Sequence, residues 1–243
     1  MVRRPAGQDP GRHYAGSIVI DHCKARSGRL EYVEIRTDDL TLKPIVDDAK
    51  TIQFYQTALY GDPVVMRRFA DGIVRGREVV ERRVRSLADR WRNHDCYSAF
   101  VISHALTGEC LGHTLFGHGD SKGETEYALL LKRYFADGSP LWNRGIGRQV
   151  IYAMFTGWAP WLAAAGIPVV NDADGKAYPL DTLTATVRKD NLAHRLFDRL
   201  LVDDPTNVKR TFDSTKWGAE RTHFFTTPEA MRSLRRQLLG GAF

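Results

Sequence analysis

A glycine-rich turn that runs directly into a long amphipathic helix is the feature that most restricts how this chain of 243 residues can fold. The turn occupies residues 140–149, and apolar residues recur at the spacing of one helix face from Val150 to Leu162. The start of such a helix leaves main-chain N–H groups without partners, and the helix dipole favours negative charge there. Glycines at Gly145 and Gly147 let a ligand approach the main chain closely. The turn therefore predicts a binding site for a phosphate or pyrophosphate group.

The segments around this turn define a longer pattern. An apolar strand is expected at residues 126–131, shortly before the turn. A second strand is expected at residues 182–187, after the long helix and a connection that contains Gly and Pro. Asn191 follows that strand, and residues 192–200 have the apolar spacing of another helix. The order is strand, glycine turn, long helix, strand, Asn and helix.

This order resembles that of the GNAT superfamily of acyl-CoA-dependent N-acyltransferases. Residues 142–147 resemble its pyrophosphate loop, in the Trp-containing form of the ribosomal-protein alanine acetyltransferases. Residues 184–191 resemble the later strand that ends in Asn, and the likeness covers roughly residues 38–201. The chain departs from the family at Asp198, where a Tyr is frequent, at His194, where the alanine-acetyltransferase group tends to carry Ser, and at residues 200–204, where Gly-Phe is usual.

The resemblance implies an α/β (α+β) fold with a mixed, mostly antiparallel twisted sheet and helices on both faces. Two central strands are expected to splay where an acyl-pantetheine group enters. We expect a partly ordered N-terminal extension over residues 1–37 and one acyltransferase domain over residues 38–243. The length and the hydrophobic content of 43% suffice for one substantial core.

The implied activity is transfer of an acetyl or other acyl group from acyl-CoA to a primary amine, by direct attack in a ternary complex. No Cys or Ser lies in a nucleophile motif, so no covalent intermediate is expected. The residues expected to bind acetyl-CoA are Leu130, Leu131, Trp142, Asn143, Arg144, Gly145, Ile146, Gly147, Arg148 and Asn191. The resemblance implies that the Asn191 amide contacts the pantetheine arm, although helix capping would leave the same sequence trace.

Proton transfer requires a base, and the resemblance implies an acid near the start of the strand at residues 126–131. Glu126 is the candidate, acting through water, and Glu124 on the same face of the strand competes with it. His194 is a second catalytic candidate, as a proton donor to the thiolate, although a structural role is also open. Further residues expected near the acceptor amine are Glu124, Trp217, Glu220 and His223.

A basic amphipathic helix is expected over residues 75–92, and it carries part of the net charge of +6. Its arginines favour either an anion or nucleic-acid contact, or a solvated face balanced by neighbouring acids. Because aromatic residues do not alternate with the arginines, we favour the solvated face. A non-catalytic module on the same fold, which senses acyl-CoA or binds RNA or protein, is the alternative function.

Composition bounds the remaining expectations. No apolar run approaches the ~20 residues of a membrane span, and no apolar stretch follows the basic start, so neither a membrane anchor nor a secretory signal is expected. Cys23, Cys96 and Cys110 have neither disulfide nor metal spacing, which favours the cytoplasm and a site without metal. The acceptor is expected to be a protein N-terminus or a small-molecule amine, and the protein a monomer or homodimer.

Overall fold

A single large β-sheet organises the molecule. The computed structural model describes residues 14–24, 30–201, 207–214 and 219–240. Within them, nine strands form one sheet in the order β1-β2-β3-β4-β5-β6-β9-β11-β10. The strands are β1 (Val19–Lys24), β2 (Leu30–Arg36), β3 (Leu40–Pro44), β4 (Ala99–His104), β5 (Cys110–His118), β6 (Glu124–Leu131), β9 (Thr182–Arg188), β10 (Val208–Ser214) and β11 (Ala219–Thr226). A separate hairpin joins β7 (Val169–Val170) to β8 (Ala177–Tyr178).

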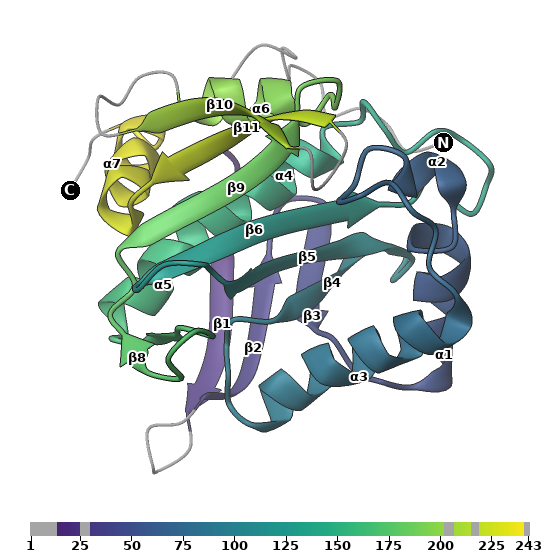
Figure 1. Ribbon diagram of the computed structural model, residues 1–243, viewed down its shortest axis with the longest axis horizontal. Coiled ribbons are helices and arrows are strands. Elements are labelled where there is room, and N and C mark those ends of the chain that lie inside the picture. Colours follow the sequence, from purple (N-terminus) through teal and green to yellow (C-terminus); the bar gives the residue numbers. More distant parts are fainter. Residues whose placement is uncertain (1–13, 25–29, 202–206, 215–218, 241–243) are drawn as a thin grey trace.

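The only parallel pair in the described sheet is β6 with β9, and this pair opens along its length. Residues 124–127 of β6 pair with residues 182–185 of β9, and the pairing then stops. Both strands continue, β6 to Leu131 and β9 to Arg188, and they diverge in Figure 1. The mixed, mostly antiparallel sheet expected from the sequence is thus confirmed, and the structure has the splayed central strands.

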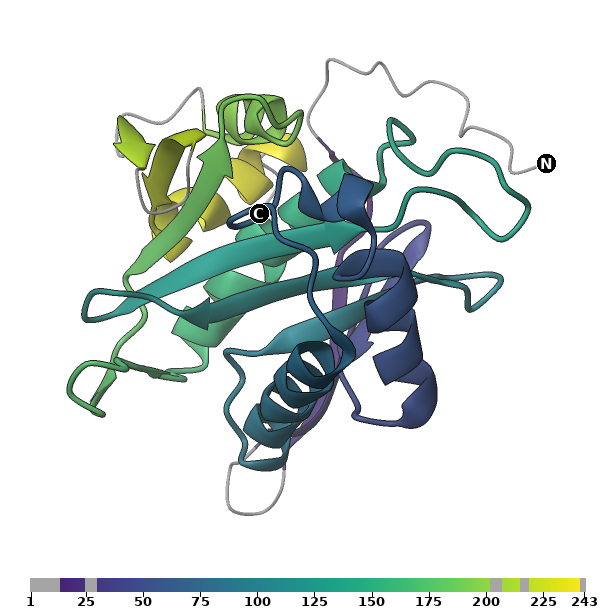
Figure 2. The same cartoon turned by 45° about the vertical axis from the view of Figure 1, so that its right-hand side comes forward.

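Helices cover both faces of the sheet (Figures 1 and 2). We call the face that carries α3 in Figure 1 the front face and the opposite one the back face. The front face carries α1 (Ala49–Phe54), the π-helical turn η1 (Tyr55–Leu59), α2 (Pro63–Met66) and α3 (Arg77–Arg92). The back face carries α4 (Ile146–Tyr152), the π-helical segment η2 (Ala153–Trp158), α5 (Ala159–Ala164), α6 (His194–Leu200) and α7 (Pro228–Leu238).

Each face has its own apolar core because side chains alternate along the strands. On the back face, Tyr127 of β6 packs edge-on against Phe155 and Phe197, at ring-centroid distances of 5.0 and 5.9 Å. On the front face, Leu130 of the same strand packs in the cluster that includes Val84 and Tyr55. No helix of the described residues is long and apolar enough to cross a membrane.

The long helix expected after the glycine turn is present, but its middle is π-helical. Pro160 lies at the start of α5 and has no N–H to donate to the carbonyl one turn earlier. The hydroxyl of Thr156 donates a hydrogen bond to the carbonyl of Tyr152 at 2.7 Å. A locally widened turn accommodates these changes, because π-helical segments arise where the regular ladder is interrupted. The segment from α4 to α5 therefore stays continuous beneath the sheet.

The first described residues belong to the domain. Strands β1 and β2 pair antiparallel and extend the sheet beyond β3. Tyr14 is almost fully buried, and its carbonyl accepts a hydrogen bond from Arg235 of α7 at 3.4 Å. The boundary that we expected between residues 37 and 38 thus falls inside the sheet, and the described residues 14–24 and 30–37 are part of the same domain rather than an extension to it.

Candidate active site

The glycine turn presents main-chain donors at the start of α4. Asn143 and Gly145 both have left-handed backbone angles, with φ of 67° and 82°. Gln149 is the first residue of α4 whose N–H reaches a carbonyl in this turn, that of Gly145 at 3.0 Å. Within the described part of the chain, the N–H groups of residues 143–147 have no hydrogen-bond partner. Such a concave run of N–H groups at a helix start is a site for an anion.

Gly147 lies where this turn faces the splayed strands. A Cβ built on Gly147 would lie 3.4 Å from Leu196 of α6 and 3.7 and 3.8 Å from Leu131 and Leu129 of β6. These are ordinary van der Waals contact distances, so Gly147 packs against the end of β6 and α6, in the region beside the diverging strands that we call the slot. Arg144 is exposed and Arg148 is half-buried on either side of it. Both arginines are expected to add charge-assisted contacts to a phosphate in this turn.

The end of β6 beyond its pairing with β9 turns main-chain groups towards the same slot. The N–H of Lys132 and the carbonyl of Glu124 point towards β5. The main-chain N–H and carbonyl groups of the even-numbered residues of β6 therefore all point towards β5. The main-chain N–H and carbonyl groups of Leu129 and Leu131 consequently point towards β9. They lie beyond Tyr127, the last residue of β6 that pairs with β9. The indole N–H of Trp142 donates to the Leu131 carbonyl at 3.3 Å. The strand edge and the turn thus face one slot.

This alternation along β6 changes our expectation that Leu130 binds acetyl-CoA. Leu130 pairs with His113 of β5, and its side chain is 3% exposed in the front core. Its main chain and side chain are both engaged, so Leu130 does not face the slot. Leu129 does face the slot. No sequence pattern distinguishes Leu129 from Leu130, because the choice depends on which side of β6 is paired with β5.

The two glutamates at the start of β6 lie on the front face in different environments. Glu124 is buried and accepts a hydrogen bond from the hydroxyl of Thr184 at 3.0 Å. The Glu126 side chain is exposed, but protein atoms surround it densely enough that desolvation raises the pKa of its carboxyl group. Asp120 and Glu124 raise this pKa further, whereas the Thr186 hydroxyl and Arg221 lower it. A raised pKa suits a carboxylate that accepts a proton.

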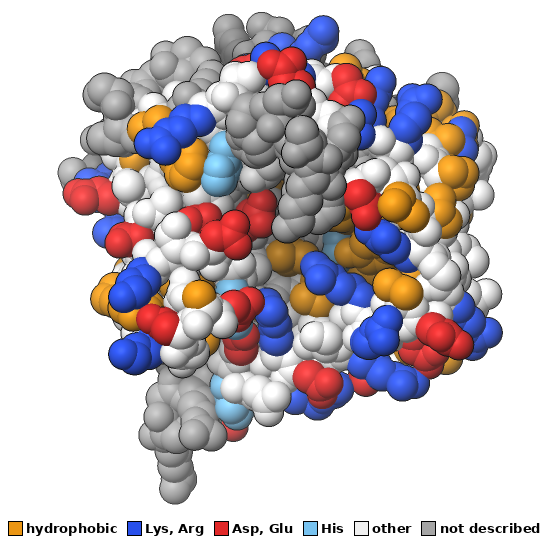
Figure 3. Space-filling view, viewed as in Figure 1, with side chains coloured by type: hydrophobic (Ala, Val, Ile, Leu, Met, Phe, Trp, Pro, Cys, Tyr) orange, Lys and Arg blue, Asp and Glu red, His pale blue; other side chains and the backbone are white. Residues whose placement is uncertain are grey.

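The surface in front of these strands carries both charge signs. Figure 3 shows acidic side chains gathered left of centre, over the region of β6 and β9, with a histidine above them. His223 on β11 lies on this front face, opposite Thr186 of β9. Burial lowers the pKa of His223, and Arg210 lowers it too, whereas Glu124 and Asp120 raise it. His223 therefore lies on the face where an acceptor amine would meet Glu126.

Asn191 makes two hydrogen bonds that the sequence left open. Its side-chain oxygen accepts from the N–H of Ala193 at 3.0 Å, which is a local turn before α6, whose own N-cap is Ala193. Its side-chain nitrogen donates to the carbonyl of Arg68 at 3.3 Å. Arg68 belongs to residues 67–72, a segment after α2 that we call the strap. The Asn191 amide is thus turned to the strap in this structure, and its contact with pantetheine stays a prediction.

His194 lies on the opposite face of the sheet from Glu126. Its Nδ1 lies 2.8 Å from a carboxylate oxygen of Asp198, and its Nε2 lies 2.7 Å from the hydroxyl of Thr222 on β11. Because both ring nitrogens are engaged on the back face, the arrangement favours the structural interpretation. Asp198, one turn later on α6, holds the imidazole in this orientation.

The remaining acceptor-site candidates divide between three places. Glu220 lies on the back face, because it alternates with the front-facing Arg221, and its carboxylate pairs with Lys189 at 2.5 Å. It does not meet Glu126. Trp217 lies outside the described residues. Of the four candidates, Glu124 and His223 share the face of Glu126.

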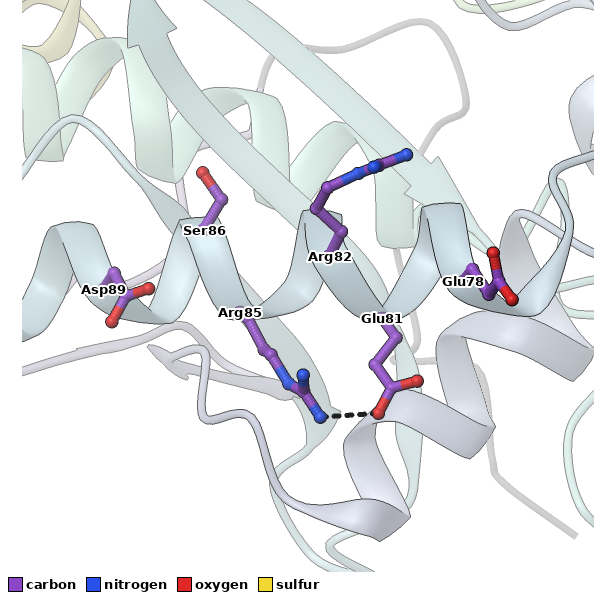
Figure 4. A pocket seen from close by; sticks show the side chains of 6 residues that line it. All are labelled: Glu78, Glu81, Arg82, Arg85, Ser86 and Asp89. Carbon is purple, nitrogen blue, oxygen red and sulfur yellow. Dashed lines mark hydrogen bonds and ion pairs between the residues drawn. The ribbon is translucent and has the colours of Figure 1, made fainter.

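The basic helix α3 has acids and arginines interleaved on its outer face. A shallow depression there is lined by Glu78, Glu81, Arg82, Arg85, Ser86 and Asp89 (Figure 4). Arg85 pairs with Glu81 at 2.6 Å, and Arg92 pairs with Asp89 at 2.6 Å and with Asp47 at 2.8 Å. These pairs neutralise much of the local positive charge, which supports the interpretation as a solvated face.

Two histidines of β5, His113 and His118, contact other side chains of the protein. His118 at the end of β5 lies between two carboxylates, with its Nε2 2.9 Å from Asp95 and its Nδ1 2.6 Å from Asp172. His113 is buried beside the hydroxyl of Tyr55 at 3.1 Å. Among the described residues, no group of three or more His, Cys, Asp or Glu side chains is arranged to hold a metal ion.

Comparisons with known proteins place this architecture in one structural class. A GNAT-family acetyltransferase from Bacillus anthracis has a TM-score of 0.56 at 13% identity, with 81% of this chain and 99% of that chain covered. An acetyltransferase from Salmonella typhimurium that modifies the N-terminal serine of ribosomal protein L7/L12 has 0.54 at 11%, with 78% and 95% covered. A spermidine N-acetyltransferase from Vibrio cholerae, solved with CoA and spermine, has 0.50 at 12%, with 79% and 97% covered.

No protein-family model matches the sequence, and no curated protein matches it either. The structural likeness alone therefore identifies the fold, which is that of the GNAT superfamily. The resemblance read from residues 142–147 and 184–191 is confirmed at the level of the fold.

Proposed function

We propose that this protein transfers an acyl group, most simply acetyl, from acyl-CoA to a primary amine. The observation that carries the proposal is the convergence of two sets of open main-chain donors on one slot. The N–H groups of residues 143–147 suit a pyrophosphate, and the open edge at Leu129 and Leu131 suits the amides of a pantetheine arm. Gly147, which has no side chain, lies between them. The neighbours of the same fold are acetyltransferases, which supports the assignment.

The proposed chemistry uses Glu126 as the base. A primary alkyl amine is mostly protonated near neutral pH, since such groups titrate near the value of Lys, about 10.4. Glu126 accepts this proton through a water molecule, and the free amine nitrogen then attacks the thioester carbonyl. A C–N bond forms and the C–S bond breaks. The attacking nitrogen loses its second proton to solvent, and the CoA thiolate takes up a proton from solvent. The raised pKa of Glu126 brings it closer to the operating pH of a base.

The acceptor belongs to one of two classes, a protein N-terminus or a small-molecule amine. The Salmonella neighbour acts on a protein N-terminus, and the Vibrio neighbour was solved with the polyamine spermine. Asp120 and Glu124 both interact electrostatically with the proposed base, Glu126. Carboxylates near the site suit a cationic acceptor of either class.

The test combines binding with turnover. Calorimetry first measures the affinity for acetyl-CoA. As a control, it measures the affinity for 4′-phosphopantetheine, which is CoA without its adenosine 3′,5′-diphosphate portion. Release of free thiol is then followed with peptides that begin in Ala or Ser, with the same peptides N-acetylated as matched controls, and with spermine. Thiol release that requires a free amine supports the proposal. Tight binding of acetyl-CoA without turnover on any amine would instead favour the acyl-CoA-sensing module, and no binding would contradict both.

A further inference from the structure

A buried arginine on the front face connects three parts of the acceptor side. Arg221 of β11 is 4% exposed and lies opposite Arg188, the last residue of the splayed strand β9. Its guanidinium donates a hydrogen bond to the carbonyl of Ala70 in the strap. It also interacts electrostatically with Glu126, Asp190 and Asp71. Burying a cation is costly unless carboxylates or carbonyls compensate it, so this position indicates a specific arrangement.

The strap lies across the open end of the central strands. On one side, Asp62 caps α2 and lies 3.9 Å from Arg133, which follows β6. On the other side, the Arg68 carbonyl is held by Asn191, which follows β9. Figure 2 shows α2 and the segment after it crossing from the end of β6 towards β9 and β11. An acceptor that approaches Glu126 on the front face therefore meets this crossing.

The strap is held in a conformation that needs an anchor. Ala70 has a φ of 44°, in the left-handed region that residues with a Cβ adopt at a cost in free energy. The Ala70 carbonyl is the group that Arg221 binds. Such strain persists only where neighbouring contacts compensate it, and the Arg221 bond is a contact of this kind.

We propose that Arg221 is a positioning residue for acyl transfer: it anchors the strap beside the acceptor opening and supplies the positive charge that faces Glu126. This inference rests on the proposed function and concerns how its acceptor side is built. The two roles separate chemically, because the anchor requires a donor that reaches Ala70, whereas the electrostatic role requires only a charge. Arg221→Lys retains the charge and shortens the reach, and Arg221→Gln removes the charge.

The first measurement needs no catalytic activity. Hydrogen exchange of the peptide that contains residues 67–72 is compared among wild type, Arg221→Lys and Arg221→Gln. Loss of a hydrogen bond from a charged donor is expected to speed exchange in the strap by roughly tenfold or more. Arg210→Gln is the matched control, because Arg210 is an exposed arginine on the next strand that faces His223. Unchanged exchange in folded Arg221 variants would overturn the anchoring role.

The second measurement uses turnover. In both Arg221 variants the KM for the amine is expected to rise several-fold, with the affinity for acetyl-CoA unchanged. Arg221 lowers the pKa of Glu126, so Arg221→Gln should raise it further and move the acidic limb of the pH–rate profile to higher pH. Arg221→Lys should leave that limb in place. If the acidic limb of the pH–rate profile does not move in Arg221→Gln, the electrostatic role is contradicted. If the wild type shows no turnover, the proposed function is contradicted, and the hydrogen-exchange result still decides the anchoring role.

Discussion

Gly147 offers a direct test of the anion site, because three substitutions there separate space from charge. A Cβ at this position would lie 3.4 Å or more from the side chains around it, so Gly147→Ala, Gly147→Asn and Gly147→Asp should all fold. An acid in the first turn of a helix interacts favourably with the helix dipole, by about 0.3–1 kcal/mol. Gly147→Asp is therefore expected to keep or slightly raise the melting temperature.

The affinity for acetyl-CoA should change in the opposite direction. Two unit negative charges about 5 Å apart repel by roughly 0.8 kcal/mol at the dielectric constant of water and by roughly 3.3 kcal/mol at an effective value of about 20. The slot beside Leu131 and Leu196 is partly buried, so its environment lies between these limits. Gly147→Asp should accordingly bind acetyl-CoA roughly 4- to 300-fold more weakly than Gly147→Asn, which has nearly the same shape.

Calorimetry on folded variants measures this ratio directly, and repeating it from low to high salt tests its origin. The difference between the Asp and Asn variants should shrink as ionic strength rises, because salt screens the repulsion. Gly147→Ala reports the cost of filling the slot without charge. Equal affinities for acetyl-CoA in wild type, Gly147→Asn and Gly147→Asp would refute the assignment of the pyrophosphate to this turn.

Three further predictions follow from other sites. Glu126→Gln should lower kcat by roughly 10²-fold or more, least at high pH where the free amine is abundant, with acetyl-CoA affinity unchanged in calorimetry; a rate within a few-fold of wild type across pH would exclude Glu126 as the base. His118 has a raised pKa, because Asp95 and then Asp172 bind its protonated form while burial opposes them. Its contribution to stability, roughly 1–3 kcal/mol, should be complete below about pH 6.5 and lost as pH rises through the folded-state pKa, so the difference in unfolding free energy between wild type and His118→Gln in urea should shrink from pH 6 to pH 9. Reversing Arg82 and Arg85 to Glu should leave acetyl-CoA affinity nearly unchanged, whereas strong salt-dependent RNA binding that this variant abolishes would restore the nucleic-acid alternative.

The sequence predicted the half of the fold in which apolar spacing and turn residues agree. The strands β6 and β9, the helix α3 and the helical segment after the glycine turn lie where the patterns placed them. Residues 49–59 also form helix, with Ile52, Tyr55 and Leu59 on the buried side, and this segment was not recognised. Strand β2 was also not recognised, and its pairing with β1 and β3 decides its conformation.

The candidate site was predictable where a local motif forms it and not where distant segments meet. The turn at residues 142–147 is a continuous stretch, so its geometry follows from its own glycines and its helix. The contact between Arg221 and Ala70 joins residues 151 positions apart, and no local pattern marks either one. The same reason explains why Asn191 was assigned to a ligand although its amide donates to Arg68, 123 positions away.

The single parallel pair in the sheet also has a consequence for how the chain folds. Each of the strands β2 to β6 pairs with the strand before it in sequence. Most of these pairings close short loops, and the exception is β3 with β4, between which the helices α1 to α3 are inserted. The pairing of Glu124 with Thr182 must instead close a loop that contains the whole α4–α5 segment. Closing a long loop costs entropy before its contacts form. We expect β9 to join β6, and β3 to join β4, after the strands that are linked by short loops have paired. The proposed slot for acyl-CoA is then completed only when a long loop has closed.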